Sequence, residues 1–548
     1  MSFARLRAPS RYRLGTLALA AVPLVALTVF FLYPVAGMLA RGFWPEGSFD
    51  PGAVLEVLGR PRVRRVLWFT LWSAGAATLI SVLAGVPVAF VLHRLRFPGR
   101  DLLRALVVVP FVLPTVVVGV AFRQLIAPSG WLGGLGLDGT AAAIVAALVF
   151  FNISVVVRTV GSFWEAIDPR REEAAAALGA SPWQVWRTVT LPALRPGIVS
   201  AATVVFLFCA TAFGVVLTMG GLRYANVETE IYLLTTQELD LTAAAALSIL
   251  QLLVIVALLA LSARVRRSAA PVDRSSRPVP RPRRTHLAVL SWTAVVVVFL
   301  MAPLASLVVA SLQRGDSWGL QNYRALNTTG DRNALLVPAL EGLANSLLFA
   351  LVASLLALVL GSIVAFLVSR PAGGRLTTVL DGVFMLPLGV SAVTVGFGFL
   401  ITLDKPPLDL RSSALLIPIA QAMVALPLVV RTVGPVLRSI DDRQRQAAAS
   451  LGAGPARVFW TVDLPIAWRA LLAAAGFAFA VSLGEFGATS FLARDDQPTL
   501  PVVIYRLIGQ PGAENFGMAM AASVVLAATT AAVMFAVQRL RVGSMGAF

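Results

Sequence analysis

Four polar side chains lie inside long apolar runs of this sequence, where they could act on a solute. Glu485 falls in the segment SLGEFGATSFLA, Arg123 lies near the end of another apolar run, and Asn152 and Asn345 lie within two more. A charge held in hydrocarbon costs about 2.5–3.5 kcal/mol, so it usually faces a cavity, a partner or the aqueous edge. Glu485 and Arg123 could therefore line or gate a passage, pair with each other, or reach the interface. Asn152 and Asn345 could line the same passage or bond neighbouring helices.

Two polar segments share a second pattern, whose residue types suit docking rather than catalysis. We call residues 172–192 the first elbow and residues 445–465 the second elbow. The same spacing holds in both, with these residues at the matching positions: Glu173, Ala174, Ala175, Gly179, Leu191 and Pro192 in the first, and Gln446, Ala447, Ala448, Gly452, Leu464 and Pro465 in the second.

The local composition of each elbow predicts two short helices that meet at a bend. Alanine favours helix, and Gly179 can supply the left-handed residue that ends it. Ser181 followed by Pro182 is a cap and first-turn pair that can open the next helix, and Gly454 followed by Pro455 can do the same. Such a small-residue bend is a knob that a groove on another protein can grip.

Nothing in the sequence predicts catalysis on this chain. The phosphate-binding pattern GxxxxGK[ST] is missing, and Lys405 is the single lysine. Cys209 is the single cysteine and lies in an apolar run, which excludes cysteine-based metal sites and favours a small buried hydrophobe. We therefore expect no cofactor and no metal on this chain.

Composition places the chain in a membrane. Hydrophobic residues make up 58% and charged residues only 13% of its 548 residues, which is outside the usual range of soluble proteins. The net charge of +18 comes from arginines in short clusters between apolar runs, so it does not indicate nucleic-acid binding.

A span needs about 20 apolar residues, and the sequence predicts twelve, with the first retained as a helix rather than cleaved. We expect an all-α polytopic membrane protein with these approximate spans: 14–39, 66–92, 103–126, 141–163, 197–219, 242–262, 287–311, 343–369, 378–403, 413–437, 467–492 and 516–537.

The two halves of the chain repeat each other. The segment VVRTVGSFWEAIDPRREEAAAALGA from Val156 aligns without gaps on VVRTVGPVLRSIDDRQRQAAASLGA from Val429, an offset of 273 residues. Six spans per half give the repeats the same orientation, related by an axis along the membrane normal. We therefore predict one repeat in 1–262, an arginine- and proline-rich linker in 263–286, and a second repeat in 287–548.

Short-loop arginines predict which ends face the cytoplasm. The N-terminal tail and the loop after the second span are basic, whereas the loop 127–140 has no basic residue. Both termini, the linker and both elbows are therefore expected inside. The loop before the second span opposes this assignment, because it would lie outside with four arginines: Arg60, Arg62, Arg64 and Arg65.

The duplicated elbow resembles the EAA loop of the membrane subunits of ATP-binding-cassette importers. The resemblance implies a type I importer permease fold in the inner membrane, and an extracytoplasmic solute-binding protein as partner. It also implies two copies of a cytoplasmic ATP-binding subunit, which would bind ATP and Mg. Gln446 departs from the pattern, which has glutamate there, so coupling through the second elbow would differ from coupling through Glu173.

Further segments resemble the fused permeases of thiamine importers. These are LTMGG from Leu217, ETEIY from Glu228, and SLGEFGATSFLARDDQPTLPVVIYRLIG from Ser482. The resemblance implies thiamine or a related organic cation as the solute. Ferric-iron permeases share the overall plan and molybdate or sulfate permeases share parts of the last segment, so these stay as alternatives. A secondary transporter or a membrane scaffold would leave the duplicated elbow unexplained.

Overall fold

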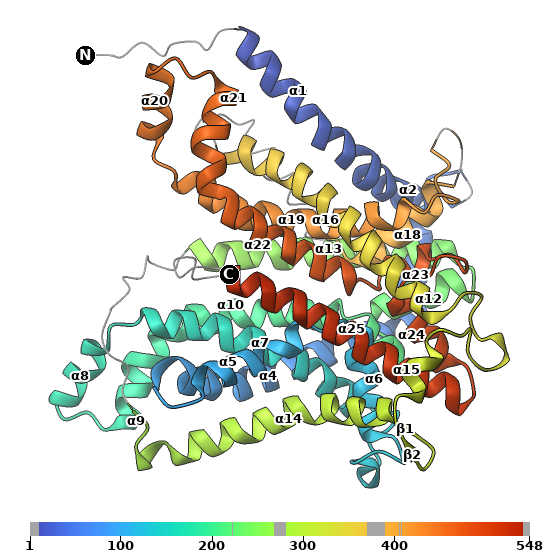
Figure 1. Cartoon of the computed structure of the whole chain (residues 1–548), viewed down its shortest axis with the longest axis horizontal. Coiled ribbons are helices and arrows are strands. Elements are labelled where there is room, and N and C mark those ends of the chain that lie inside the picture. Colours follow the sequence, from blue (N-terminus) through green and yellow to red (C-terminus); the bar gives the residue numbers. More distant parts are fainter. Residues whose placement is uncertain are drawn as a thin grey trace.

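The computed structural model describes residues 10–45, 47–221, 223–267, 281–369, 390–404, 406 and 408–540. It is helical almost throughout, as expected, and the described residues contain one two-stranded antiparallel hairpin (Figure 1). The first half contains these elements: α1 (Ser10–Leu27), η1 (Thr28–Leu32), α2 (Tyr33–Phe43), α3 (Pro51–Gly59), α4 (Pro61–Arg94), α5 (Arg100–Val112), α6 (Thr115–Ile126), η2 (Gly133–Leu135), α7 (Ala141–Ala166), α8 (Pro169–Ala177), α9 (Pro182–Val185), η3 (Trp186–Thr190), α10 (Leu191–Ala210), α11 (Gly214–Gly220), α12 (Val227–Thr236) and α13 (Leu241–Arg267).

The second half follows the same plan. Its elements are η4 (Arg284–His286), α14 (Leu287–Leu312), β1 (Gln313–Arg314), β2 (Ser317–Trp318), α15 (Gln321–Ala325), η5 (Asp331–Asn333), α16 (Ala339–Ser369), α18 (Ala392–Thr402), α19 (Leu416–Ser439), α20 (Asp442–Ser450), α21 (Pro455–Val458), η7 (Phe459–Asp463), α22 (Leu464–Leu483), α23 (Thr489–Leu492), α24 (Leu500–Gly509) and α25 (Ala513–Leu540).

Within the described residues, 10 helices are long and apolar enough to cross a membrane, or up to 11 if one bent pair counts as a span. That pair corrects the third predicted span, 103–126, which is α5 and α6 joined at an angle of 104°. Pro114 precedes α6 and prevents a continuous helix, because proline disfavours helical geometry in the residue before it. The ninth predicted span, 378–403, lies partly outside the described residues, and α18 is its described part.

The fifth and eleventh spans end earlier than expected. Helix α10 ends at Ala210 and α22 at Leu483, whereas the sequence predicted spans to 219 and 492. Two glycines near these breaks allow close approach to the bend between α5 and α6. A Cβ on Gly214 would lie 2.5 Å from the Thr115 Oγ1 atom, and one on Gly484 would lie 3.1 Å from Pro114. Both halves therefore converge on that bend.

Repeat-equivalent helices pack in the same way in each half. Helix α4 packs on α7 and α10, and α16 packs on α19 and α22. The same close contact recurs, because a Cβ on Gly85 would lie 2.8 Å from Val156 and one on Gly361 would lie 2.8 Å from Val429. Glycine at this crossing lets the two helices approach closely. The repeat found in the sequence is therefore also a repeat in packing.

The first helix of each half packs against the other half. Helix α1 lies along α16 and α2 along α18, whereas α14 lies along α4 and α6 (Figure 1). Leu27 and Phe31 belong to an apolar cluster of the second half, and Val296 and Leu300 to one of the first. The division at 263–286 stays a prediction, since residues 268–280 lie outside the described part of the chain. The two repeats nevertheless share an extensive interface.

Both elbows lie at one end of the molecule, at the left in Figure 1. Arg94, the last residue of α4, pairs with Glu172 of the first elbow at 2.6 Å. The basic start of α4 therefore lies at the opposite end. There, Arg60 pairs with Asp240 at 2.8 Å, and Arg62 pairs with both Glu230 at 2.6 Å and Glu238. These ion pairs offset part of the positive charge that opposed the predicted orientation.

Removing Arg62 is expected to destabilise the protein more than removing Arg60. The Glu230 side chain is only 1% exposed, whereas that of Asp240 is 32% exposed. Arg62→Ala leaves a buried carboxylate without its cation, which costs on the order of 2 kcal/mol because Arg62 itself is partly solvated. Thermal unfolding of the purified variants in detergent measures the difference. Equal midpoints for Arg62→Ala and Arg60→Ala would contradict this expectation.

Candidate functional site

The first elbow has the two-helix form that its sequence predicted. Asp168 caps α8 through a bond from the Arg170 N–H at 3.0 Å. Gly179 ends the turn with φ at +88°, a left-handed conformation suited to glycine. Ser181 and Gln184 then form a reciprocal capping box that opens α9. A π-helical turn, η3, leads without a break into α10.

The second elbow repeats this form with fewer side-chain caps. Asp441 caps α20 through a bond from the Arg443 N–H at 2.9 Å, and Gly452 has φ at +82°. Gly454 replaces the serine cap before α21, so no side-chain bond opens that helix. The π-helical turn η7 leads directly into α22. Each elbow is therefore rigidly continuous with one long membrane helix.

The tip of each elbow exposes the same apolar side chain. Leu178 is 90% exposed and its repeat equivalent Leu451 is 89% exposed, each just before the left-handed glycine. Trp183 and Trp460 are also exposed on the two elbows. Leu178 and Leu451 are large apolar side chains left in solvent at matching positions, which is typical of a protein interface. The geometry therefore provides two equivalent exposed knobs.

A polar brace closes each elbow, with its charges arranged differently in the two halves. In the first, Glu172 accepts a bond from the Thr190 hydroxyl at 2.7 Å. At the equivalent positions of the second, Arg445 donates to Asp463 at 2.8 Å, and it also pairs with Asp442 at 2.8 Å. Burial alone would lower the pKa of Arg445, but hydrogen bonds and charges from both aspartates outweigh it and raise the pKa. The second brace is therefore an ion-pair network.

Arg445→Met is expected to loosen the second elbow. Asp463 is fully buried, so losing the guanidinium costs on the order of 3 kcal/mol. Arg443→Met is a matched control, because Arg443 is exposed on the same short helix. Limited proteolysis of the two purified variants compares the elbows directly. Equal cleavage rates within residues 445–465 would show that the brace does not hold this elbow.

A cavity of about 430 Å³ lies between the halves, at the breaks that follow α10 and α22. Asn152 and Ser391 contribute amide and hydroxyl groups to its wall. Its aromatic side chains come from both halves: Phe111, Phe151, Phe208, Phe213, Phe477 and Phe486. We call this space the central cavity.

Two carboxylates border the central cavity, one from each half, and they are its only charged lining residues within the described chain. Glu485 was expected from the sequence; Glu228, on α12, was missed. Glu228 is fully buried and accepts bonds from the Gln251 amide and, at 2.9 Å, from the Ser391 hydroxyl. The signal available for it was an acidic residue in the segment NVETEIYLL, whose Asn226 caps a short apolar helix.

A row of four aromatic rings crosses the interface between the halves. Phe213 and Phe486, which are repeat equivalents, stack with centroids 5.3 Å apart. Tyr232 lies 5.4 Å from Phe213, and its repeat equivalent Tyr505 lies 5.5 Å from Phe486. We call these four residues the aromatic row. Its two phenylalanines also line the central cavity.

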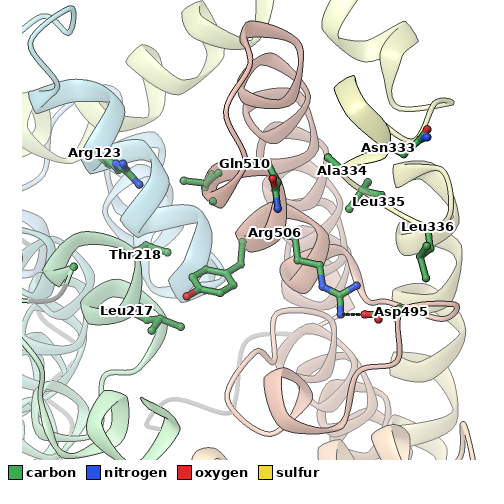
Figure 2. A pocket seen from close by; sticks show the side chains of 14 residues that line it. Arg123, Leu217, Thr218, Asn333, Ala334, Leu335, Leu336, Asp495, Arg506 and Gln510 are labelled. Carbon is green, nitrogen blue, oxygen red and sulfur yellow. Dashed lines mark ion pairs between the residues drawn. The ribbon is translucent and has the colours of Figure 1, made fainter. Parts of the chain in front are cut away.

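A second pocket, of about 620 Å³, is lined in part by residues of α6 and α24 (Figure 2), which lie at the end opposite the elbows (Figure 1). Tyr505 of the aromatic row lines it, so the row lies between this outer pocket and the central cavity. Arg506 pairs with Asp495 at 2.6 Å on one side, and exposed Arg123 lies across the pocket from them. The central cavity, the aromatic row and this outer pocket therefore lie along the interface between the two repeats.

Comparison with known proteins identifies the family. The family of the binding-protein-dependent transport system inner membrane component matches residues 81–268 and 334–542. The chain belongs to this family. It is therefore a multi-pass inner-membrane permease subunit, and its family implies an ATPase and a solute-binding protein as partners.

Two curated relatives match most of the permease. The thiamine transport system permease protein ThiP of Escherichia coli (strain K12) is 29% identical, with 81% of this chain and 83% of the relative covered. ThiP of Brucella abortus (strain 2308) is 27% identical, with 87% and 90% covered. Among solved structures, a bacterial ABC transporter involved in the import of the acidic polysaccharide alginate aligns with 45% of this chain and 93% of that chain, at 17% identity and a TM-score of 0.39.

The permease places the four polar residues first singled out in different surroundings. Glu485 and Asn152 line the central cavity, whereas Arg123 lines the outer pocket. Arg123 and Glu485 form no ion pair with each other; Glu485 instead accepts bonds from Ala488 and Thr489. Asn345 donates to the Pro498 carbonyl at 3.2 Å and is not part of the cavity wall.

Asn152 and Cys209 contact each other in the buried interior of the first half. Asn152 donates to the Leu148 carbonyl at 2.9 Å and to the Cys209 sulfur at 3.2 Å. Cys209 is buried, as its apolar surroundings predicted. Within the described residues, no three or more His, Cys, Asp or Glu side chains gather as a metal site.

Proposed function

We propose that this permease forms the translocation pathway of an importer for thiamine, driven by ATP hydrolysis on a partner subunit. The observation that supports the solute most directly is the match to permeases named for thiamine transport over more than four-fifths of both chains. The acidic, aromatic central cavity is compatible with a cationic ring system. Ferric iron is the alternative solute, because paired carboxylates also suit a hard cation.

The two elbows support a stoichiometry of two ATPase subunits for each permease. Each elbow exposes its own leucine, Leu178 or Leu451, and each joins its own membrane helix. One ATPase copy would grip each elbow in the cytoplasm, with ATP and Mg bound there rather than on this chain. The solute-binding protein would then dock at the opposite end, and both chain termini would lie in the cytoplasm.

The geometry supports a transport cycle in which closure of the ATPases rocks one repeat against the other. Helices α10 and α22 run from the elbows to the breaks at the aromatic row. A rigid helix carries a displacement of its elbow along its whole length, so the row and the central cavity would respond to ATP binding. This is the alternating access expected of a repeat-built transporter.

Uptake by a reconstituted complex tests this function. The permease is co-expressed with its ATPase, placed in proteoliposomes with ATP inside, and supplied outside with the binding protein and radiolabelled thiamine. Accumulation that requires both ATP and the binding protein is expected. Uptake that persists with a hydrolysis-dead ATPase would indicate a secondary transporter. Accumulation of radiolabelled ferric iron with no thiamine uptake would transfer the proposal to the alternative solute.

A further inference from the structure

We propose that the central cavity is a transient binding site for an organic cation, which meets Glu228 and Glu485 with its charge and the phenylalanines with its apolar surface. This inference rests on the proposed import function, because it places the transported solute at one point on its path. It adds to that function a site within the permease itself, apart from the site on the solute-binding protein.

The first observation is a pair of buried carboxyl groups, in the protein interior, that no basic side chain faces in the described part of the chain. Glu228 is fully buried and Glu485 is 7% exposed. Neither forms an ion pair with an arginine, lysine or histidine in the described part of the chain, and no such residue lines the cavity there. A buried carboxylate is costly unless a cation or several donors compensate it. A cationic solute would supply the missing counter-charge.

The second observation is that fixed hydrogen-bond donors orient each carboxyl group. Gln251 and Ser391 donate to Glu228. At Glu485, the backbone N–H groups of Ala488 and Thr489 donate at 2.7 Å and 3.1 Å, and the Thr489 hydroxyl donates as well. Such donors fix the orientation of each carboxyl group and offset part of the cost of ionising it in a buried site. With a cation in the cavity, the two groups would therefore present a preorganised negative potential to it.

The third observation is the aromatic wall around these charges. Phe111 lies 5.5 Å from Phe151 and 6.3 Å from Phe208, and Phe213 stacks on Phe486. Aromatic faces attract cations and also stack on flat rings. The volume of about 430 Å³ lies within the usual range for a small-molecule site. Charge, wall and size together favour an organic cation with aromatic or alkylammonium character.

A hydrogen bond at the cavity wall connects the two repeats, and its loss could release a bound cation. Glu228 belongs to the first half, but Ser391, at the start of α18, belongs to the second. The next residue, Ala392, lies 2.9 Å from the position of a Cβ on Gly487, two residues after Glu485. Rocking of one repeat against the other would separate the carboxylates and break this bond. The same motion that opens the path would therefore weaken the hold on the cation.

Direct binding to the unmodified complex provides the first test. The permease–ATPase complex in nanodiscs, without nucleotide or binding protein, is titrated with three probes: thiamine, the aromatic cation benzyltrimethylammonium, and the neutral N,N-dimethylbenzamide of similar size. We expect the two cations to bind at least about 10-fold more tightly than the neutral probe, the scale of a charge-assisted contact. Equal affinity for cation and neutral probe would overturn the proposal without any mutation.

Charge-neutralising variants provide the second test. Glu228→Gln and Glu485→Gln keep the shape and some hydrogen bonding of each side chain, and each is expected to weaken cation binding by about 10-fold to 100-fold. Glu341→Gln is the matched control, since Glu341 is exposed at the start of α16 and outside the cavity. For Glu485→Gln, uptake should fall further than the amount of assembled complex. Unchanged cation affinity in both cavity variants, when they assemble normally, would overturn the proposal.

These tests separate the site from the proposed function. If Glu228→Gln and Glu485→Gln import thiamine with unchanged KM and kcat, the result supports the import function and contradicts the cation site. If benzyltrimethylammonium binds in a carboxylate-dependent way but thiamine is not imported, the result supports the cation site and contradicts thiamine as the solute. The neutral probe should be insensitive to both substitutions, and an equal loss of its binding would indicate a distorted cavity and overturn the charge argument.

Discussion

Gly179→Asp and Gly452→Asp are each expected to abolish coupled uptake while leaving the permease in the membrane. Both glycines hold a left-handed backbone, at φ of +88° and +82°, which a residue with a Cβ adopts at a cost of about 1 kcal/mol or more. Space is not the obstacle, because nothing lies within 4 Å of a Cβ at either position. The aspartate instead adds strain and a charge beside the exposed leucine of each elbow.

Association with the ATPase measures this effect directly. Each variant is expected to lose about 10-fold or more of its affinity for the ATPase subunit, as when a residue central to an interface is lost. Gly134→Asp is the control, since Gly134 also has nothing within 4 Å of a Cβ but lies in the loop at the opposite end. Normal uptake by both elbow variants would remove the elbows from the coupling pathway.

The elbows could be predicted in detail because their structure is local. The alanines, Gly179 and the Ser181–Pro182 pair act through neighbours a few residues away, and the structure follows each of them. The repeat was equally accessible, since the offset of 273 residues pairs Phe213 with Phe486, and these two rings stack at the interface. Local sequence signals and the internal repeat were therefore sufficient to predict the elbows and the two-repeat organisation.

Contacts between segments that are distant in the sequence could not be predicted from local signals or from the repeat. Hydropathy identifies α14 as a span but does not show that it packs on α4 and α6 of the other half as well as on α25 of its own half. The pairing of Arg123 with Glu485 was one reasonable option, yet the two lie in different hollows. Glu228 was treated as part of a motif because its segment lies between predicted spans. Its burial depends on α13 and α18, which meet it only in the folded protein.

Replacing both Phe213 and Phe486 by alanine is expected to make the permease leak. The stacked rings belong to the aromatic row between the outer pocket and the central cavity, and both are almost fully buried. Removing them leaves Tyr232 and Tyr505 on either side of an opened space, so the apolar constriction no longer excludes water and solute. Thiamine trapped in proteoliposomes should then escape without ATP or binding protein, faster than from vesicles carrying the unmodified complex.

Loss of two buried rings also destabilises a protein, so the leak must be separated from general loosening. Each buried phenylalanine replaced by alanine costs about 3–5 kcal/mol in a packed core. The combination of Phe150→Ala and Phe399→Ala is a matched control, because it removes one fully buried ring from each half outside both the aromatic row and the central cavity. Equal efflux from the two double variants would mean that the row packs the interface without closing the path. Efflux confined to the Phe213→Ala and Phe486→Ala variant would make repeat-equivalent rings the barrier, so the two halves would have to separate for each solute to pass.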